Sequence, residues 1–167
     1  KISNTVVLFI VNRLIEILGI TVFAVGVFLF ISLISYSPED PNFIFPENTG
    51  IKNFLGFQGS YTSDLFFQSL GLISYLASVT LMFTGINIFI RKNFFLIIGN
   101  IFFIVLYSFF GSTFFNFYYK DAFLLYINGN GGFIGRYLDE NFLHKLITLN
   151  ENLAYYILAL ITIVLFL

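Results

Sequence analysis

Apolar residues in this chain are grouped into four long runs, and polar segments separate the runs. The first three runs predict membrane-spanning helices over about 14–35, 64–90 and 94–115, because each approaches or exceeds the roughly 20 residues that a bilayer requires. The fourth run, 152–167, is too short for a full span at about 1.5 Å per residue, so we expect this helix to continue beyond Leu167. The pattern predicts one all-α, polytopic membrane domain over residues 1–167 with four transmembrane helices.

The segments between the runs differ in length and in charge. Arg91–Asn93 is short and basic, and such a connection makes the second and third helices an antiparallel hairpin. The two long segments carry most of the acidic residues. The positive-inside rule therefore places the short segment and both termini in the cytoplasm, and it places the two long segments outside as extracytoplasmic loops.

The second extracytoplasmic loop contains a further helical pattern. After the turn-rich stretch 128–132, apolar residues recur at every fourth position, and these residues are Ile134, Leu138, Phe142 and Leu146. This spacing predicts a short amphipathic helix that lies along the membrane or beneath the transmembrane helices.

Composition supports a membrane protein and excludes several kinds of site. Hydrophobic residues make up 58% of the chain and charged residues 10%, whereas a soluble domain has about 25% charged residues. The chain has no cysteine and a single histidine, so it lacks disulfides, thiolate metal sites and histidine metal clusters. The net charge of −1 gives no basic field that would attract nucleic acid.

Proline, glycine and aspartate mark the boundaries of the first extracytoplasmic loop. Pro38 and Pro41 restrict the backbone and remove two hydrogen-bond donors, which ends the first helix. Gly56 and Gly59 allow tight backbone geometry before the second helix. Asp64 stands directly before an apolar run, where an N-cap residue is expected, and this role is favoured over that of a proton carrier.

Small residues predict close packing between the transmembrane helices. Gly71, Ser74 and Ser78 lie on the second predicted helix, and Ser74 and Ser78 form a small-xxx-small pair. On the first helix, Gly19 and Gly26 are seven residues apart and share one face. We therefore expect these faces to contact other helices rather than lipid.

No residue pattern indicates catalysis. The chain lacks a G-x-x-x-x-G-K-[ST] phosphate-binding motif, and His144, with Glu140 one turn earlier, has no accompanying nucleophile. Asn100 lies inside the third helix, where we expect it to bond to a neighbouring helix, because an unpaired amide in lipid is costly. The absence of clustered charged residues inside the predicted spans weakens both a transporter and a membrane-enzyme interpretation.

The loop sequences resemble those of one family. The first helix ends in S-Y-S-P-E-D-P, and the second helix is preceded by N-x-x-G-x-x-G-x-x-x-S-D and continues with G-x-x-S-Y; the matching residues are Ser35, Tyr36, Pro38, Asp40, Pro41, Asn53, Gly56, Gly59, Ser63, Asp64, Gly71, Ser74 and Tyr75. A G-G-x-I-G motif follows at 131–135. These motifs resemble the N-terminal four-helix membrane domain of FtsK/SpoIIIE-type bacterial DNA translocases. The chain departs from the family at Ser78, where proline is common.

The residues alone indicate a four-helix membrane anchor, and the resemblance implies a more specific function. It implies an inner-membrane domain that anchors a DNA translocase at the division septum and assembles with other division proteins and with copies of itself. ATP, magnesium and DNA would bind a motor domain beyond this chain, which itself is expected to be neither an enzyme nor a cofactor-binding protein. A subunit of a small transporter or channel is the alternative.

The hypothesis that follows is an extracytoplasmic cap built from both loops, with rigid backbone and partner-binding residues. The residues that we expect to bind partners are Asp40, Gly56, Gly59, Asp64, Asp121, Gly132 and Gly135. Rigid loops favour this role because they lose less entropy on binding than flexible ones.

Overall fold

The computed structural model describes residues 2–42, 50–119, 125 and 127–167. Every regular element in these ranges is helical. The elements are α1 (Ile2–Ile34), α2 (Gly56–Leu70), the 3-10 turn η1 (Gly71–Ile73), α3 (Ser74–Arg91), α4 (Leu96–Tyr118), α5 (Gly132–Leu138), the π-helical turn η2 (Asp139–Leu143), α6 (His144–Leu149) and α7 (Glu151–Phe166).

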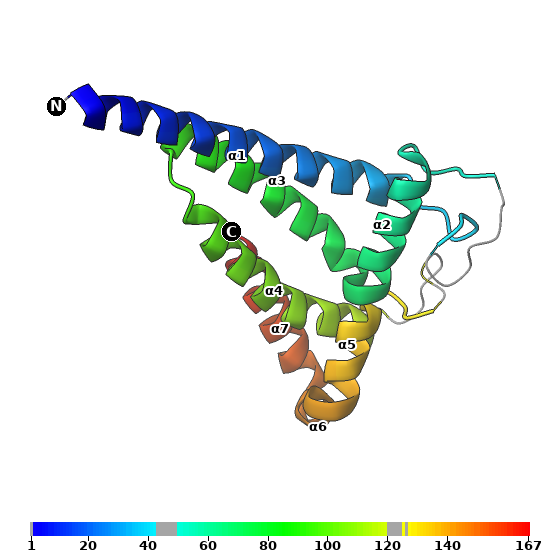
Figure 1. Ribbon diagram of the computed structural model, residues 1–167. Coiled ribbons are helices and arrows are strands. Elements are labelled where there is room, and N and C mark those ends of the chain that lie inside the picture. Colours follow the sequence, from blue (N-terminus) through cyan, green and yellow to red (C-terminus); the bar gives the residue numbers. More distant parts are fainter. Residues whose placement is uncertain (1, 43–49, 120–124, 126) are drawn as a thin grey trace.

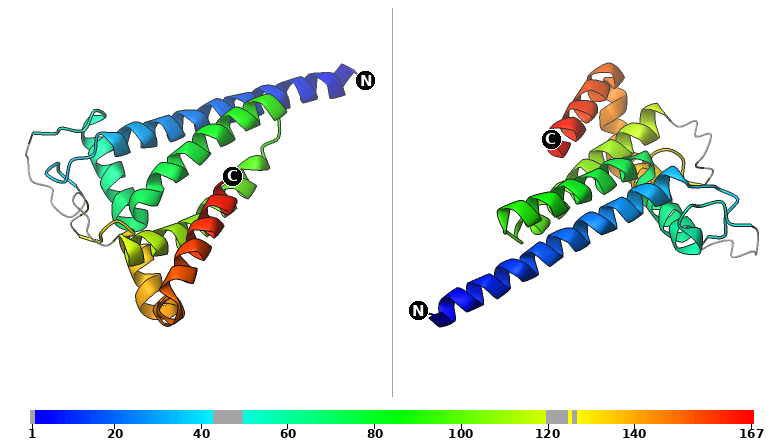
Figure 2. Two further views of the ribbon diagram at one scale, coloured as in Figure 1. Left: turned by 180° about the vertical axis from the view of Figure 1, so that it is seen from behind. Right: turned by 90° about the horizontal axis from the view of Figure 1, so that it is seen from above.

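Four of these helices stand in a row. α1 packs on α3, α3 on α4 and α4 on α7, so that α1 and α7 form the two edges (Figure 1). Consecutive helices of the row run in opposite directions, as the views from behind and from above also show (Figure 2). α2 and α5 lie across one end of the row, and the N-terminus lies at the other end (Figure 1).

Length and composition mark which segments can cross a membrane. Within the described residues, three helical segments are long and apolar enough, namely Thr5–Ile34, Gly56–Arg91 and Leu96–Tyr118. α7 is a shorter apolar helix of 16 residues. The all-helical membrane fold predicted from the hydrophobic runs is therefore confirmed, and the side of the membrane that each loop faces stays a prediction.

α1 is longer than the predicted first helix over 14–35. It begins at Ile2, because the residues before Gly19 include no glycine or proline that would interrupt a helix. It ends at Ile34, four residues before Pro38, as the proline pattern indicates. The apolar stretch Val6–Val11 is exposed along its whole length.

The prediction of one continuous second helix over 64–90 is wrong, both in where the helix starts and in its being unbroken. α2 begins at Gly56, and the chain turns at Gly71 before α3 begins at Ser74. Gly71 has a φ of 67°, a left-handed conformation that a helix cannot contain and that favours glycine. Only α3 therefore belongs to the row, whereas α2 lies across its end (Figure 1).

α1 and α3 contact each other through their backbones. A Cβ atom on Gly19 would lie 2.7 Å from Phe89 N, and one on Gly26 would lie 2.7 Å from Met82 N. On the opposite helix, a Cβ on Gly85 would lie 2.6 Å from Gly19 O. The prediction that Gly19 and Gly26 permit close approach of another helix is confirmed, and that helix is α3.

The last two helices of the row differ less from expectation. α4 begins two residues later and ends three residues later than the predicted 94–115. α7 begins at Glu151, and Asn150 caps it by accepting a hydrogen bond from Leu153 N at 3.1 Å.

The predicted amphipathic helix of the second loop is interrupted by η2. A π-helical turn accommodates one more residue than an α-helical turn, so the predicted four-residue spacing changes face there. Ile134 and Leu138 are half-buried, whereas Phe142 and Leu146 are exposed. The four residues therefore do not share one helical face, contrary to the prediction from their four-residue spacing. The buried face instead contains Gly132, Gly135, Asp139 and Ile147.

Candidate functional site

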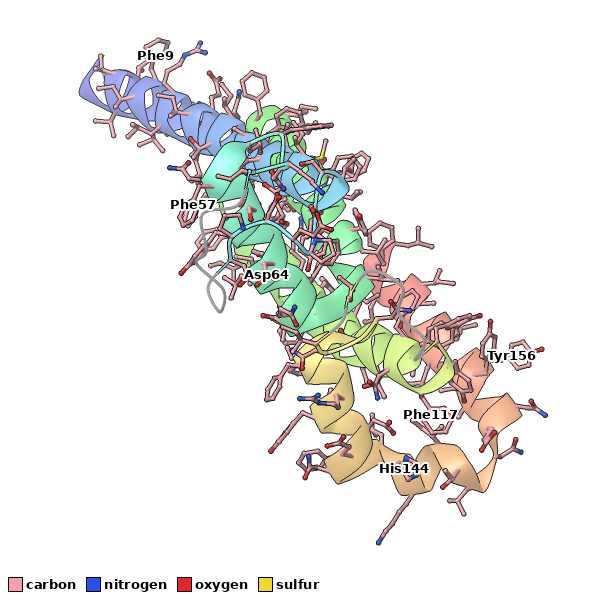
Figure 3. The ribbon with its side chains drawn as sticks, turned by 90° about the vertical axis from the view of Figure 1, so that its right-hand side faces the viewer. Phe9, Phe57, Asp64, Phe117, His144 and Tyr156 are labelled. Carbon is pink, nitrogen blue, oxygen red and sulfur yellow. The ribbon has the colours of Figure 1, made fainter. Side chains whose placement is uncertain are left out.

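The two long loops and their helices gather at one end of the row. We call this end the cap and define it as residues 36–42, 50–73, 125 and 127–149. Figure 3 looks onto the cap, with Phe57 and Asp64 on α2 and His144 on the segment that follows α5.

Asp40 and Asn53 attach the first loop to the end of α1. Asp40 Oδ1 accepts a hydrogen bond from Lys52 N at 2.9 Å, and its Oδ2 accepts one from Asn53 N at 2.8 Å. Asn53 Nδ2 donates to Ser32 O at 2.9 Å and to Ser35 O at 3.2 Å. Asp40 is only 3% exposed, so it positions the loop and does not itself form the cap surface.

The neighbouring Glu39 lies in a different environment. It forms an exposed ion pair with Lys52. The ammonium group of Lys52 lowers the pKa of the Glu39 carboxyl, and the carboxylate in turn raises the pKa of Lys52. Water screens such a pair, so we expect it to contribute little to folding.

Gly56 and Gly59 have different structural roles at the start of α2. Gly56 has a φ of 65°, and a Cβ there would meet no atom within 4 Å, so its backbone conformation alone favours glycine. Gly59 is buried, and a Cβ there would lie 2.7 Å from Leu55 Cβ and 3.0 Å from Asn53 Cγ. Gly59 therefore makes room for the Asn53 side chain that holds the loop.

Asp64 lies in the middle of α2, so the prediction that it caps a helix is wrong. It is 3% exposed. Its Oδ1 lies 3.4 Å from Tyr36 Oη and 3.5 Å from Gln68 Nε2, near the outer limit of hydrogen bonding. The carboxyl group is thus enclosed between α2 and the end of α1, and a partner could not reach it directly.

Hydrogen bonds join the two loops into one unit. Leu72 N donates to Asn130 O at 2.9 Å, and Asn128 Nδ2 donates to Gln68 Oε1 at 3.0 Å. Ser112 Oγ of α4 donates to Leu70 O at 2.8 Å. These bonds fix the end of α2 against both the second loop and the row.

The apolar centre of the cap also draws on both loops. Leu125 is 3% exposed and packs in a cluster formed with Leu29, Leu33 and Phe67. Leu29 and Leu33 come from α1, and Phe67 comes from α2. A residue of the second loop therefore completes a core that begins in the first helix.

Glycines let α5 lie against its neighbours with no side chain between. Gly132 has a φ of 63°, and a Cβ there would lie 2.5 Å from Gly71 N and 2.7 Å from Ser69 C. A Cβ on Gly71 would lie 2.6 Å from Asn130 C, and one on Gly135 would lie 2.6 Å from Ser112 C. Five of the residues predicted to bind partners, Asp40, Gly59, Asp64, Gly132 and Gly135, are therefore buried.

Asp139 completes this contact and was missed from sequence. It is 2% exposed, and its Oδ2 accepts a hydrogen bond from Asn116 Nδ2 at 2.9 Å. Its Oδ1 lies 3.2 Å from Nδ1 of His144, which makes Asp139 the partner of this histidine within the described residues. The spacing of Gly132, Gly135 and Asp139, three and four residues apart, could have indicated one helical face.

The residues predicted to pack helices contact different pairs of helices. Ser74 Oγ donates to Gly71 O at 2.7 Å and to Phe66 O at 2.9 Å, so it secures the corner between α2 and α3. Ser78 is fully buried opposite Gly26 of α1. Asn100 Nδ2 donates to Thr84 Oγ1 at 2.7 Å and links α4 to α3.

Asp121, another predicted partner-binding residue, lies outside the described residues. Across the part of the chain that the structure describes, there is no group of three histidine, aspartate or glutamate side chains that could hold a metal ion.

Besides its buried polar residues, the cap carries apolar residues on its surface. Phe54 is 79% exposed, and Phe57 and Leu65 are also exposed on the α2 side. Phe133, Tyr137 and Phe142 are exposed on the segment from α5 to α6, where the rings of Phe133 and Tyr137 stack at 5.9 Å.

A row of apolar helices with a helical cap at one end defines a polytopic membrane domain. The sequence model of the family described as the 4TM region of DNA translocase FtsK/SpoIIIE matches residues 11–167, so the chain belongs to this family of membrane domains. The family and the apolar helices place the domain in the inner membrane.

One curated relative and the solved structures complete the comparison. The chain is 33% identical over 87 residues to the DNA translocase FtsK of Azospirillum brasilense. This alignment covers 51% of the chain but 14% of that protein. No solved structure matches the chain significantly.

Proposed function

We propose that this domain anchors a DNA translocase in the inner membrane at the site of cell division and binds other division proteins through its cap. The family supports the membrane domain of a DNA translocase. The whole relative is named a DNA translocase, so DNA binding and the ATP and magnesium of its motor would belong to parts outside this domain. The cap is then extracytoplasmic and both termini are cytoplasmic.

The observation that carries this proposal is the exposed apolar surface on a rigid cap. Phe54, Phe57 and Leu65 project from α2 and the loop before it, and the cap beneath them is held by buried hydrogen bonds. Exposed aromatic residues on a fixed backbone are typical of protein contacts. Asp40, Gly59, Asp64, Gly132 and Gly135 would then act indirectly, by holding the shape of the surface that a partner contacts.

Self-association is part of the same proposal. α1 and α7 stand at the edges of the row and each packs chiefly on one neighbour. Both edges expose apolar residues that lipid or a second copy would cover. The row can therefore be extended by helices from other copies without rearrangement of the contacts described above.

A transporter or channel is less well supported. A groove of about 560 Å³ lies between α3, α4 and the end of α7, and its polar lining consists of Thr80, Asn87, Asn100 and Tyr107. No charged residue or histidine lines it. Ion coupling and proton transfer in membranes use such residues, so this groove does not favour a transport function.

Complementation of a strain depleted of the full-length protein tests the partner-binding proposal. We expect Phe54→Ser combined with Phe57→Ser to cause filamentation at normal membrane abundance, because a partner loses its apolar contacts. Phe142→Ser is the matched control, since it removes an equally exposed aromatic ring from the far side of the cap. Normal cell length with the double variant, or equal filamentation with the control, would contradict a partner site on α2.

A further inference from the structure

A groove runs along the contact between α1 and α3, away from the cap. It has a volume of about 430 Å³, within the range of about 300–1,000 Å³ that is common for ligand pockets. Every residue that lines it is apolar, and these residues are Gly19, Ile20, Phe23, Gly85, Ile86, Phe89 and Ile90.

The glycines explain why the groove exists. Gly19 and Gly85 bring the two backbones together and place no side chain at the crossing, so they form a floor. The isoleucine and phenylalanine side chains on either helix stand above this floor as walls. Ile20, Ile86 and Ile90 are exposed, so the groove opens to the surroundings of the helices, which in the membrane are lipid chains.

Cationic side chains gather at the end of the groove that is farther from the cap. Glu16 lies one turn before Gly19, and its carboxylate pairs with both Arg13, at 2.5 Å, and Lys92. Lys92 Nζ also lies 4.5 Å from the ring centroid of Phe89, a wall of the groove. Two cations against one carboxylate leave this end with a positive charge, to which the adjacent exposed Arg91 adds.

We propose that this groove binds one acyl chain of an anionic phospholipid, whose phosphate contacts Arg13 and Lys92. The apolar lining suits a hydrocarbon chain, because a void beside these side chains would lose dispersion contacts. The positive end suits a negative headgroup, as in basic membrane-surface sites for anionic lipids. A second copy of the chain would fit the glycine floor, but the cations at its end favour the lipid.

Lipid binding by the purified chain tests this site. The chain would be titrated in detergent with phosphatidylglycerol or with phosphatidylcholine of the same acyl chains, and bound lipid counted by native mass spectrometry. We expect one retained phosphatidylglycerol per chain, bound roughly fivefold more tightly than phosphatidylcholine, given the contribution of a basic residue near an anionic surface. Equal affinity for the two lipids would overturn the proposal.

Variants locate the lipid in the groove. Ile20→Trp should fill it and abolish retention, whereas Ile98→Trp, at a similarly exposed position of α4, should retain wild-type binding. Lys92→Gln changes no residue of the groove lining, and it should lower the affinity for phosphatidylglycerol to about that for phosphatidylcholine, with the acyl chain still retained. Wild-type lipid retention by Ile20→Trp, or a changed oligomer size with unchanged lipid retention, would contradict a lipid site and favour a helix contact between copies.

Discussion

Asp40 and Glu39 are adjacent acidic residues of one loop with opposite environments. The Asp40 side chain is buried and accepts two backbone hydrogen bonds, whereas the Glu39 side chain is 74% exposed in a salt bridge with Lys52. A carboxylate that accepts hydrogen bonds from buried backbone groups strengthens the fold, because those groups have no alternative partner. A solvent-exposed ion pair such as Glu39–Lys52 contributes little to stability, because water can replace either partner.

Asp40→Ala should lower the free energy of unfolding by about 2–3 kcal/mol, since the backbone N–H groups of Lys52 and Asn53 lose their acceptor. Denaturant titration of the domain in detergent, followed by circular dichroism, measures this loss. Glu39→Ala is the matched control and should leave the unfolding midpoint unchanged. An equal decrease in both variants would show that Asp40 contributes no more than a surface charge.

The sequence singled out Asp40 and Asp64 as functional residues of the first loop, but it did not predict the structural role of either side chain. The burial of Asp40 depends on Lys52 and Asn53, more than ten residues later, and no local pattern reports that contact. Asp64 precedes an apolar run as a cap would, yet the helix starts at Gly56 because the residues between continue it. Local propensity does not distinguish a cap from a helix interior when the upstream residues are themselves helix-compatible.

At the scale of elements, α5 depends on contacts that only glycine permits. Gly135 faces the backbone of α4 at Ser112, and the Asp139–Asn116 hydrogen bond fixes the same face one turn later. Such packing tolerates no added volume, because backbone atoms cannot move aside as a flexible side chain can. This contact ties the second loop to the row.

Gly135→Ala should destabilise the domain by about 1–3 kcal/mol, since its methyl group would overlap the Ser112 carbonyl group. The loss would appear as a lower midpoint in thermal unfolding followed by circular dichroism. Gly99→Ala provides the control, because Gly99 also lies in a helix but has no neighbouring atom within 4 Å. That variant should be neutral or gain up to about 1 kcal/mol from helix propensity. Destabilisation by Gly99→Ala equal to that by Gly135→Ala would contradict a specific contact.

Helices were easier to predict than the breaks between them. Long apolar runs predicted a helix in the region of each of α1, α3, α4 and α7, and Pro38 predicted the end of α1, because helix formation in lipid satisfies the backbone whatever the neighbours are. The turn at Gly71 and the π-helical turn at Asp139–Leu143 depend on the second loop and on Asn116. These tertiary contacts override the regular spacing of apolar residues, which is why Ile134 and Leu146 do not lie on one helical face.

At the scale of the whole molecule, the row has two chemically different ends. The cap end carries the buried carboxylates Asp40, Asp64 and Asp139 and the exposed aromatic residues. The other end carries Arg13, Arg91 and Lys92, with Glu16 between two of them. The sequence predicted this segregation from loop charge, and the structure adds that Lys92 joins the hairpin to α1 through Glu16.

The orientation of the row in the membrane can be tested directly because the chain contains no cysteine. Single cysteines at Gln58 and Asn141 of the cap, and at Asn93 of the hairpin, are all at exposed positions. By the positive-inside rule, an impermeant maleimide added to cells with a permeabilised outer membrane should label the two cap cysteines and spare Asn93→Cys until the cells are lysed. Labelling of Asn93→Cys alone in unlysed cells would invert the orientation and place the cap in the cytoplasm, where it could not meet an extracytoplasmic partner.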